Sequence, residues 1–210
     1  MSERRKKEPE VRMTEILDAA QKLFAEKGYA KTTVTDILAV HGLSKGVFYY
    51  YFKSKEEVMD AIIERIITEI VASAKKIVAN PNLTPQQKLS EVLLGSGQAP
   101  ELTKAKDQII EEFHAPENAE MHQKSLVQTV NRLAPVITQI LADDSITVTS
   151  DYPEETVALL LAAGSFIFDE SLFDFSADQR TRYAIAFVEL IAKAFGLPPD
   201  YFADSQDAFT

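Results

Sequence analysis

Side chains that could bind a phosphate or a nucleic-acid base are concentrated between Thr32 and Lys55. Hydroxyl and ammonium groups donate hydrogen bonds to phosphate oxygens, and an exposed tyrosine can bond a phosphate or stack on a thymine methyl group. The adjacent Tyr49, Tyr50 and Tyr51 would cover about 200° of a helix, so at least one must project outward. This stretch is therefore suited to contact DNA. The tyrosines could instead form a packing surface, an alternative equally well supported for Tyr49, whereas DNA contact is favoured for Tyr50.

Charge is distributed unevenly along the chain. The 210 residues carry a net charge of −10, but residues 1–55 hold 11 lysines and arginines against 7 aspartates and glutamates, a net charge of +4. The remainder carries −14. Because lysine and arginine neutralise phosphates, only the N-terminal part is suited to lie against a nucleic acid. An ordinary soluble protein with a basic tail would show the same imbalance, so charge alone leaves both interpretations open.

Capping residues and a glycine divide this stretch into two short helices. Thr33, with Asp36 three residues later, forms a capping box for the first helix. Gly42 supplies the turn, since a positive φ is favourable only for glycine. Ser44 then caps a second helix, which is expected over residues 45–52. The pattern predicts a helix-turn-helix.

A longer helix is expected on each side of this motif. An apolar stripe begins near Glu10 and ends at Gly28, a residue type that adopts the left-handed conformation after a helix. On the other side, Ser54 and Glu57 form a second capping box. It opens a helix that should continue to about residue 79, a length of about 37 Å. Such a helix could connect the N-terminal motif to the rest of the chain.

The rest of the chain is also expected to be helical. Glycine is scarce, with 7 residues, and apolar residues recur at spacings of three and four. This pattern predicts an all-α fold of about nine helices. The five helices that follow the first four should begin near residues 84, 101, 117, 153 and 176. Pro135 predicts a kink within the third of these five.

Several kinds of site are excluded by residue type or spacing. The sequence has no cysteine, which excludes disulfides, thiolate metal sites and cysteine nucleophiles. His41, His114 and His122 do not have the spacing of a helical metal pair. There is no glycine-rich phosphate loop and no G-x-S-x-G motif. We therefore expect no metal, no cofactor and no catalytic residues, and the protein is not expected to be an enzyme.

The chain also lacks the features of export or membrane insertion. Its first residues are charged and contain no apolar run of the kind found in a signal peptide. No uncharged apolar stretch reaches the roughly 18 residues that a membrane span needs. We expect a cytoplasmic protein with no membrane partner.

Three motifs occur in order in the N-terminal part: Thr33–Ile37, Gly42–Gly46 and Tyr49–Val58. With these motifs, roughly residues 12–60 resemble the N-terminal domain of tetracycline-repressor (TetR) family regulators. The resemblance implies a three-helix DNA-binding domain in residues 1–55 and a helical ligand-binding and dimerisation domain in residues 56–210. The sequence departs from the family where Leu38 and His41 replace the usual alanine, and where Tyr51 replaces a common histidine.

The resemblance also implies which residues contact DNA. The family's phosphate-contacting positions correspond to Thr33, Thr35, Ser44, Tyr49, Tyr51 and Lys55. Its base-reading positions correspond to Lys45, Gly46 and Tyr50.

The C-terminal part is expected to form a dimer through the eighth and ninth helices. Residues 157–168 are apolar on nearly all sides, which is more than one core face requires. Small residues in this segment would let a second helix approach closely, and two such helices from each subunit would form a four-helix interface. The small residues are Ala158, Ala162, Ala163 and Gly164. In the family that this sequence resembles, the subunits meet in this region.

A small-molecule site is implied by the same resemblance. Aromatic and acidic side chains could hold an apolar or cationic ligand, and the candidates are Phe113, Phe166, Phe168 and Asp169. The alternative is that the aromatic residues belong to the core and the acids to the solvated surface, which for any single residue is the commoner case.

The function expected from the sequence is that of a dimeric, sequence-specific DNA-binding transcriptional regulator. It would bind a palindromic operator as a repressor and be released by a small-molecule inducer. An activator cannot be separated from a repressor by sequence. The alternative from another class is a helical small-molecule-binding or enzymatic protein that uses the helix-turn-helix only as a packing unit.

Overall fold

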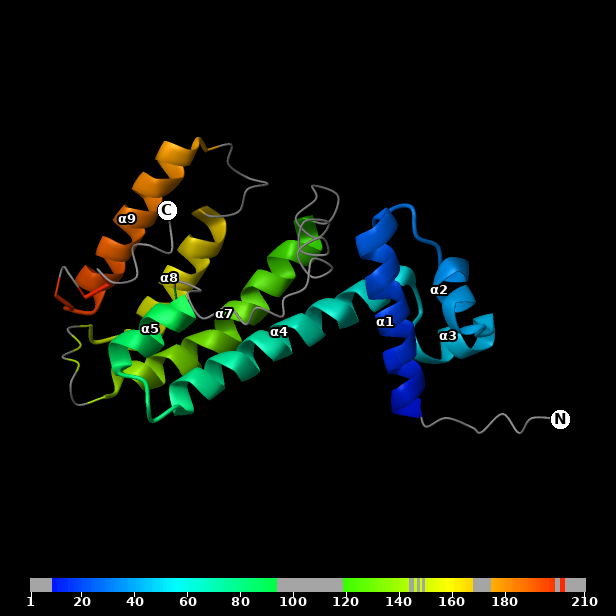
Figure 1. Cartoon of the computed structure of the whole chain (residues 1–210), viewed down its shortest axis with the longest axis horizontal. Helices are drawn as coiled ribbons and strands as arrows, with labels where there is room; N and C mark the ends of the chain where they lie inside the picture. Colours follow the sequence, from blue (N-terminus) through cyan, green and yellow to red (C-terminus); the bar gives the residue numbers. More distant parts are fainter. Residues whose placement is uncertain are drawn as a thin grey trace. The chain divides into compact units, whose positions relative to one another are not determined.

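A computed structural model describes residues 9–93, 119–143, 146, 148, 150–167, 175–198 and 201–202 of the chain. Within these ranges the chain contains helices and no strand, which confirms the all-α prediction (Figure 1). The helices are α1 (Pro9–Lys27), α2 (Val34–His41), α3 (Lys45–Tyr51), α4 (Lys55–Ala79), α5 (Pro85–Leu93), α7 (Ala119–Leu141), α8 (Pro153–Ile167) and α9 (Ala177–Ala194). The helix expected from residue 101 lies outside the described residues. None of the described helices is both long and apolar enough to cross a membrane.

The chain divides into two compact units. The first comprises Met1–Ile66 and Pro100–Met121, and the second comprises Ile67–Ala99 and His122–Thr210. The division falls inside α4, so this helix contributes residues to both units. The first unit therefore holds α1, α2, α3 and about three turns of α4.

The first unit is built on a small apolar core. α1 packs on α2, and α2 packs on α3. The side chains that fill this core are almost completely buried; they include Ile16, Ala20, Phe24, Ile37, Phe48, Phe52, Val58, Met59 and Ile62. These residues recur at helical spacing along each element, so the apolar faces turn inward and the polar faces remain available.

The predicted caps are present at both helices of the helix-turn-helix. The Thr33 hydroxyl accepts from the backbone N–H of Asp36. The Asp36 carboxylate in turn accepts from the backbone N–H of Thr33, which completes a capping box. Gly42 adopts a φ of 60°, as the predicted turn requires. Ser44 caps α3 by accepting from the backbone N–H of Val47 at 3.4 Å. Phe52 was expected inside this helix but is its C-cap, with an extended backbone.

Only one of the two hydrogen bonds of the capping box predicted at the start of α4 is present. The Ser54 hydroxyl accepts from the backbone N–H of Glu57 at 3.1 Å, as expected. The Glu57 carboxylate, however, accepts from the backbone N–H of Lys53 at 2.5 Å. A carboxylate on the third helical residue can reach either of the two N–H groups that precede the helix, and here it takes the earlier one.

In the second unit, α8 packs on α9. Gly164 belongs to this contact, because a Cβ atom built on it would lie 2.9 Å from the Phe187 ring. The close approach at Gly164 is therefore to a side chain of the same chain. α9 begins with the predicted capping box between Ser176 and Gln179, and Gly196 follows it with a φ of 66°. α7 continues as an α-helix through Pro135.

Candidate nucleic-acid interface

The helix α3 has only seven residues, and it combines a buried apolar side chain with exposed polar and aromatic ones. Phe48 is completely buried and attaches the helix to the core. Lys45, Gly46, Tyr49 and Tyr50 are exposed. The side chains that the sequence predicts to contact DNA therefore lie on a helix that the buried Phe48 attaches to the core.

The three adjacent tyrosines take different environments. Tyr49 is 58% exposed and lies edge-on to Phe48, with ring centroids 5.3 Å apart. Tyr50 is 75% exposed and meets Tyr51 edge-on at 4.8 Å. Tyr51 is half-buried. The prediction that at least one tyrosine projects outward is confirmed, and Tyr50 projects furthest.

The fold of the described residues does not require a glycine at position 46. It lies in α3 at negative φ, and a Cβ atom built on it would meet only the Ser44 hydroxyl oxygen, at 3.9 Å. An alanine would therefore fit inside the protein. The absence of a side chain leaves space on the outside of α3, where another molecule could approach the backbone closely.

The hydroxyl groups at the start of α2 differ in what they can still donate. Thr33 uses both of its donors on Asp36: its backbone N–H and its hydroxyl each lie 2.8 Å from Oδ2. Thr35 is exposed and makes no side-chain hydrogen bond within the described part of the chain. Of these two predicted phosphate contacts, Thr35 has an available hydroxyl, whereas Thr33 would first have to release Asp36.

Asp36 carries a stable negative charge beside Thr33. The Thr33 backbone N–H, followed by the Thr33 hydroxyl and by Lys27, lowers the pKa of this carboxyl from 3.8 to about 2. The Lys27 ammonium lies 3.0 Å from Oδ2. These contacts connect the start of α2 to the end of α1, and the charge disfavours an anion placed directly over Thr33.

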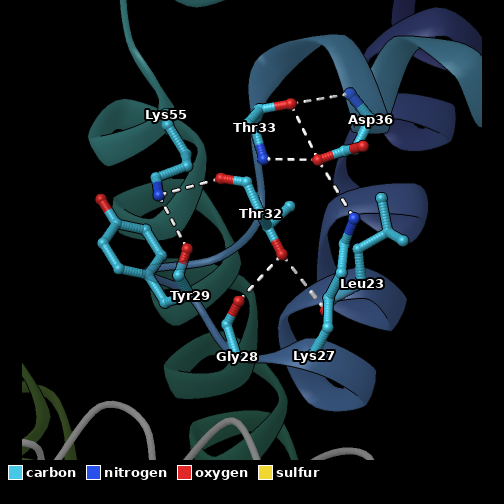
Figure 2. A network of polar contacts seen from close by, with 8 residues as sticks. All are labelled: Leu23, Lys27, Gly28, Tyr29, Thr32, Thr33, Asp36 and Lys55. Atoms are coloured by element: carbon cyan, nitrogen blue, oxygen red, sulfur yellow. Dashed lines mark hydrogen bonds and ion pairs between the residues drawn. The ribbon is translucent and has the colours of Figure 1, made fainter.

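Lys55 lies where the sequence predicted a phosphate contact, but its ammonium group is partly buried and bonded to main-chain atoms of the same unit (Figure 2). Nζ donates to the carbonyl oxygen of Tyr29 at 2.7 Å and to that of Thr32 at 3.0 Å. It also lies 4.1 Å from the centroid of the Tyr29 ring. Burial lowers the pKa of Lys55. Two of its three N–H donors are therefore already used.

Thr32 is the residue that sequence reasoning missed. It is 1% exposed, and its hydroxyl donates to the carbonyl oxygens of Gly28 at 2.9 Å and Leu23 at 3.3 Å. It thereby ties the segment before α2 to the last turn of α1 and to the residue that follows it. The sequence identifies Thr33 through Asp36 three residues later, but nothing in it marks Thr32, because the acceptors of Thr32 are main-chain atoms.

The side chains predicted to bind a ligand are not among those that the structure describes. Phe113, Phe168 and Asp169 lie outside the described residues. Phe166 belongs to α8, but its side chain is not described. Among the described residues there is also no group of three or more histidine, aspartate or glutamate side chains that could hold a metal ion.

Two family models match the chain. The model for bacterial regulatory proteins of the tetR family matches residues 16–62, and the model for a tetracyclin repressor-like C-terminal domain matches residues 101–190. Together they cover more than half of the chain, and the first spans the helix-turn-helix.

A curated relative matches about a third of the chain. The HTH-type transcriptional repressor KstR2 of Rhodococcus jostii (strain RHA1) is 41% identical over 69 residues. This match covers 33% of the present chain and 34% of the relative. The chain thus spans about a third of the length of that relative.

Similar solved structures extend over most of the chain. SmeT, the repressor of the Stenotrophomonas maltophilia multidrug efflux pump SmeDEF, has a TM-score of 0.56 and 24% identity over 87% of this chain and 89% of that chain. SmeT has also been solved as a complex with triclosan. A TetR/AcrR-family transcriptional regulator from Thermobifida fusca YX-ER1 has a TM-score of 0.54 and 26% identity over 86% of this chain and 96% of that chain.

Proposed function

Because the chain belongs to the tetR family of bacterial regulatory proteins, we propose that it is a DNA-binding transcriptional repressor that a small-molecule inducer releases from its operator. The family consists of regulators of transcription, so the alternative of an enzyme that uses the helix-turn-helix only for packing is set aside. A cytoplasmic location follows from the proposed function, since bacterial operators lie there.

The exposed face of α3 is the observation that carries this proposal. A buried Phe48 holds the helix while Lys45, Tyr49 and Tyr50 point away from the core. Two largely exposed tyrosines next to a lysine contribute little to folding. They supply the donors and the flat apolar rings that phosphates and thymine methyl groups bind.

We propose distinct roles for the residues on this surface. Lys45, Gly46 and Tyr50 contact base edges in the major groove, with Gly46 allowing the backbone to come close. The groups proposed to contact flanking phosphates are the side chains of Thr35, Ser44, Tyr49 and Tyr51. Thr33 acts first as a cap, and it contacts a phosphate only where Asp36 yields its donors. All of these residues belong to the proposed DNA-binding domain, residues 1–55, which precedes the proposed ligand-binding and dimerisation domain, residues 56–210.

We further propose that the operator is palindromic and that a homodimer binds it through α8 and α9. Exposed apolar side chains on these two helices support the interface: Leu159 is 72% exposed, Leu190 50% and Tyr183 43%. Burying such side chains between two copies is favourable. Two α3 helices would then enter successive major grooves about 34 Å apart.

The inducer is proposed to bind in the C-terminal domain. Support comes from the second family model and from SmeT, a similar fold that has been solved with triclosan. Phe113, Phe166, Phe168 and Asp169 remain the proposed contacts. The inducer would release DNA only if it binds the two states of the protein with different affinity.

Selection of DNA from a random pool tests the proposal. The purified protein should enrich a sequence with two inverted half-sites, and the logarithm of its affinity should fall linearly with the logarithm of the salt concentration. Equilibrium sedimentation should give a dimer at micromolar concentration. Enrichment of no sequence would contradict the assignment to DNA, and a monomer would contradict the α8–α9 interface.

A further inference from the structure

We propose that Lys55 is a positioning residue: its ammonium group joins the two ends of the helix-turn-helix and thereby sets the angle at which α3 meets DNA. This inference rests on the proposed DNA-binding function. It assigns Lys55 a different role from the phosphate contact that the sequence suggested. We call the group formed by Lys55, Tyr29 and Thr32 the Lys55 clasp.

The clasp encloses the helix-turn-helix in the chain. Thr32 lies two residues before the first residue of α2, and Lys55 lies four residues after the last residue of α3. The bond between Lys55 Nζ and the Thr32 carbonyl oxygen joins residues 23 apart in sequence. The whole of α2, the turn and α3 is therefore closed into a loop by this hydrogen bond, in which Lys55 Nζ lies 3.0 Å from the Thr32 carbonyl oxygen.

The donor and the acceptors of the clasp suit one another. Two carbonyl oxygens accept from one ammonium group, and the Tyr29 ring covers one side of it at 4.1 Å (Figure 2). Hydrogen bonds to a charged group are stronger than neutral ones, and a cation over an aromatic face adds to them. These two bonds occupy two of the three N–H donors of the ammonium group and leave one for any other partner.

The remaining contacts in Figure 2 make the clasp part of a continuous connection. The Thr32 hydroxyl holds the carbonyl oxygens of Leu23 and Gly28, at the end of α1. The Thr32 carbonyl oxygen accepts from Lys55, the first residue of α4. A single buried residue thus links the end of α1 to the start of α4, directly ahead of α2.

A second connection fixes the same pair of helices further along. The Arg65 guanidinium donates to Asp18 Oδ1 of α1 at 2.7 Å and also to the side chain of Gln21. Lys55 and Arg65 are ten residues apart on α4, about 15 Å along the helix axis. Arg65 already holds α4 on α1. The clasp therefore controls only the position of the segment that leads into α2.

The test compares Lys55→Met with Lys53→Met. Methionine keeps much of the apolar stem of lysine and removes the ammonium group. Lys53 is exposed, lies two residues away and loses the same charge, but it takes no part in the clasp. Each variant is titrated with a duplex that the unaltered protein selected from a random pool and with a scrambled duplex, over a range of salt concentrations.

We expect Lys55→Met to bind the selected duplex about tenfold more weakly, the factor that corresponds to one charged hydrogen bond. Binding to the scrambled duplex and the salt dependence should stay unchanged, because no phosphate contact is lost. Lys53→Met should leave the ratio of the two affinities unchanged. A loss of general stability alone would lower the melting temperature without changing this ratio well below the melting temperature.

Two outcomes would overturn the proposal. If Lys55→Met weakened both duplexes equally and reduced the salt slope by about 0.9, its ammonium group would be a phosphate contact. If neither affinity changed, the clasp would have no effect on α3.

Amide hydrogen exchange without DNA tests the clasp even if no sequence is selected. Backbone amides of α2 and α3 should exchange about tenfold faster in Lys55→Met, while those of α9 keep their rates. Unchanged exchange in α2 would overturn the clasp, whereas failure of the selection alone would overturn the proposed function.

Discussion

The two helices of the helix-turn-helix begin with the same kind of cap, but they differ in whether the capping residue still has a hydrogen-bond donor available to a partner. Thr33 and Ser44 each accept a bond from the backbone three residues later. At Thr33 the third helical residue is Asp36, whose carboxylate takes back both donors of the threonine. At Ser44 the third residue is Val47, which has no side-chain acceptor. The serine hydroxyl hydrogen therefore remains available to a partner.

This difference shows that the residue three positions after a cap decides whether the cap can also bind a ligand. The start of α2 uses its polar groups internally to attach itself to Lys27 of α1. The polar groups at the start of α3 face the solvent, and the buried Phe48 attaches this helix to the core. The start of α2 is thus held by polar contacts in addition to the buried Ile37 and Leu38, whereas α3 is held by the buried Phe48.

The largest effect on DNA binding is expected from Tyr50→Ala. The side chain is 75% exposed, so the melting temperature should hardly change. Operator affinity should fall by about 1–3 kcal/mol if the ring contacts a base. Fluorescence anisotropy with the selected duplex measures the affinity. An unchanged value would remove the Tyr50 side chain from the interface.

The pair Ser44→Ala and Thr33→Ala examines the comparison directly. Each variant loses a helix cap, which should cost about 1 kcal/mol of stability in urea unfolding. Only Ser44→Ala should also weaken operator binding, because the Thr33 hydroxyl already donates its hydrogen to Asp36 and the Ser44 hydroxyl does not. Equal losses of affinity in the two variants would mean that Asp36 releases Thr33 when DNA binds.

Gly46→Ala should separate folding from binding. The new methyl group has space within the protein, and alanine favours a helix over glycine by up to about 1 kcal/mol. Thermal unfolding should show equal or higher stability, while operator affinity falls several-fold because the backbone no longer approaches the groove. An affinity equal to that of the unaltered protein would show that nothing comes close to this position.

The smallest effect is expected from the acid titration of Asp36. Its pKa is lowered to about 2, so its contribution to stability is complete above the ordinary value of 3.8 and is lost as the pH falls toward 2. Asp36→Asn should flatten the pH dependence of stability in that range. Matching curves for the two proteins would show that the cap and the Lys27 contact contribute nothing measurable.

The sequence predicted the parts of this site that depend on neighbouring residues. Caps involve side chains and backbone groups three residues apart, which explains why the predictions at Thr33, Ser44 and Ser176 are confirmed. The turn at Gly42 follows from its need for positive φ. His41, an unusual residue beside this turn, is exposed, so its size causes no conflict.

The contacts of Lys55 could not be predicted in this way. Its acceptors are main-chain carbonyls 26 and 23 residues earlier, and every residue type carries a carbonyl. The reciprocal contact of Glu57 was predicted at the wrong N–H for a related reason, because two neighbouring amides lie within its reach. The predicted ligand site rests on residue type alone and stays a prediction.

The contact between Gly164 and Phe187 also limits which sequences this fold accepts. A methyl group at position 164 would lie 2.9 Å from the end of the Phe187 ring, so this half-buried ring would have to shift or be replaced by a smaller side chain. A change at one position thus alters which residues fit at the other. The two positions are therefore expected to covary in a library of functional variants, which makes them a marker of the α8–α9 packing that can be read from sequences alone.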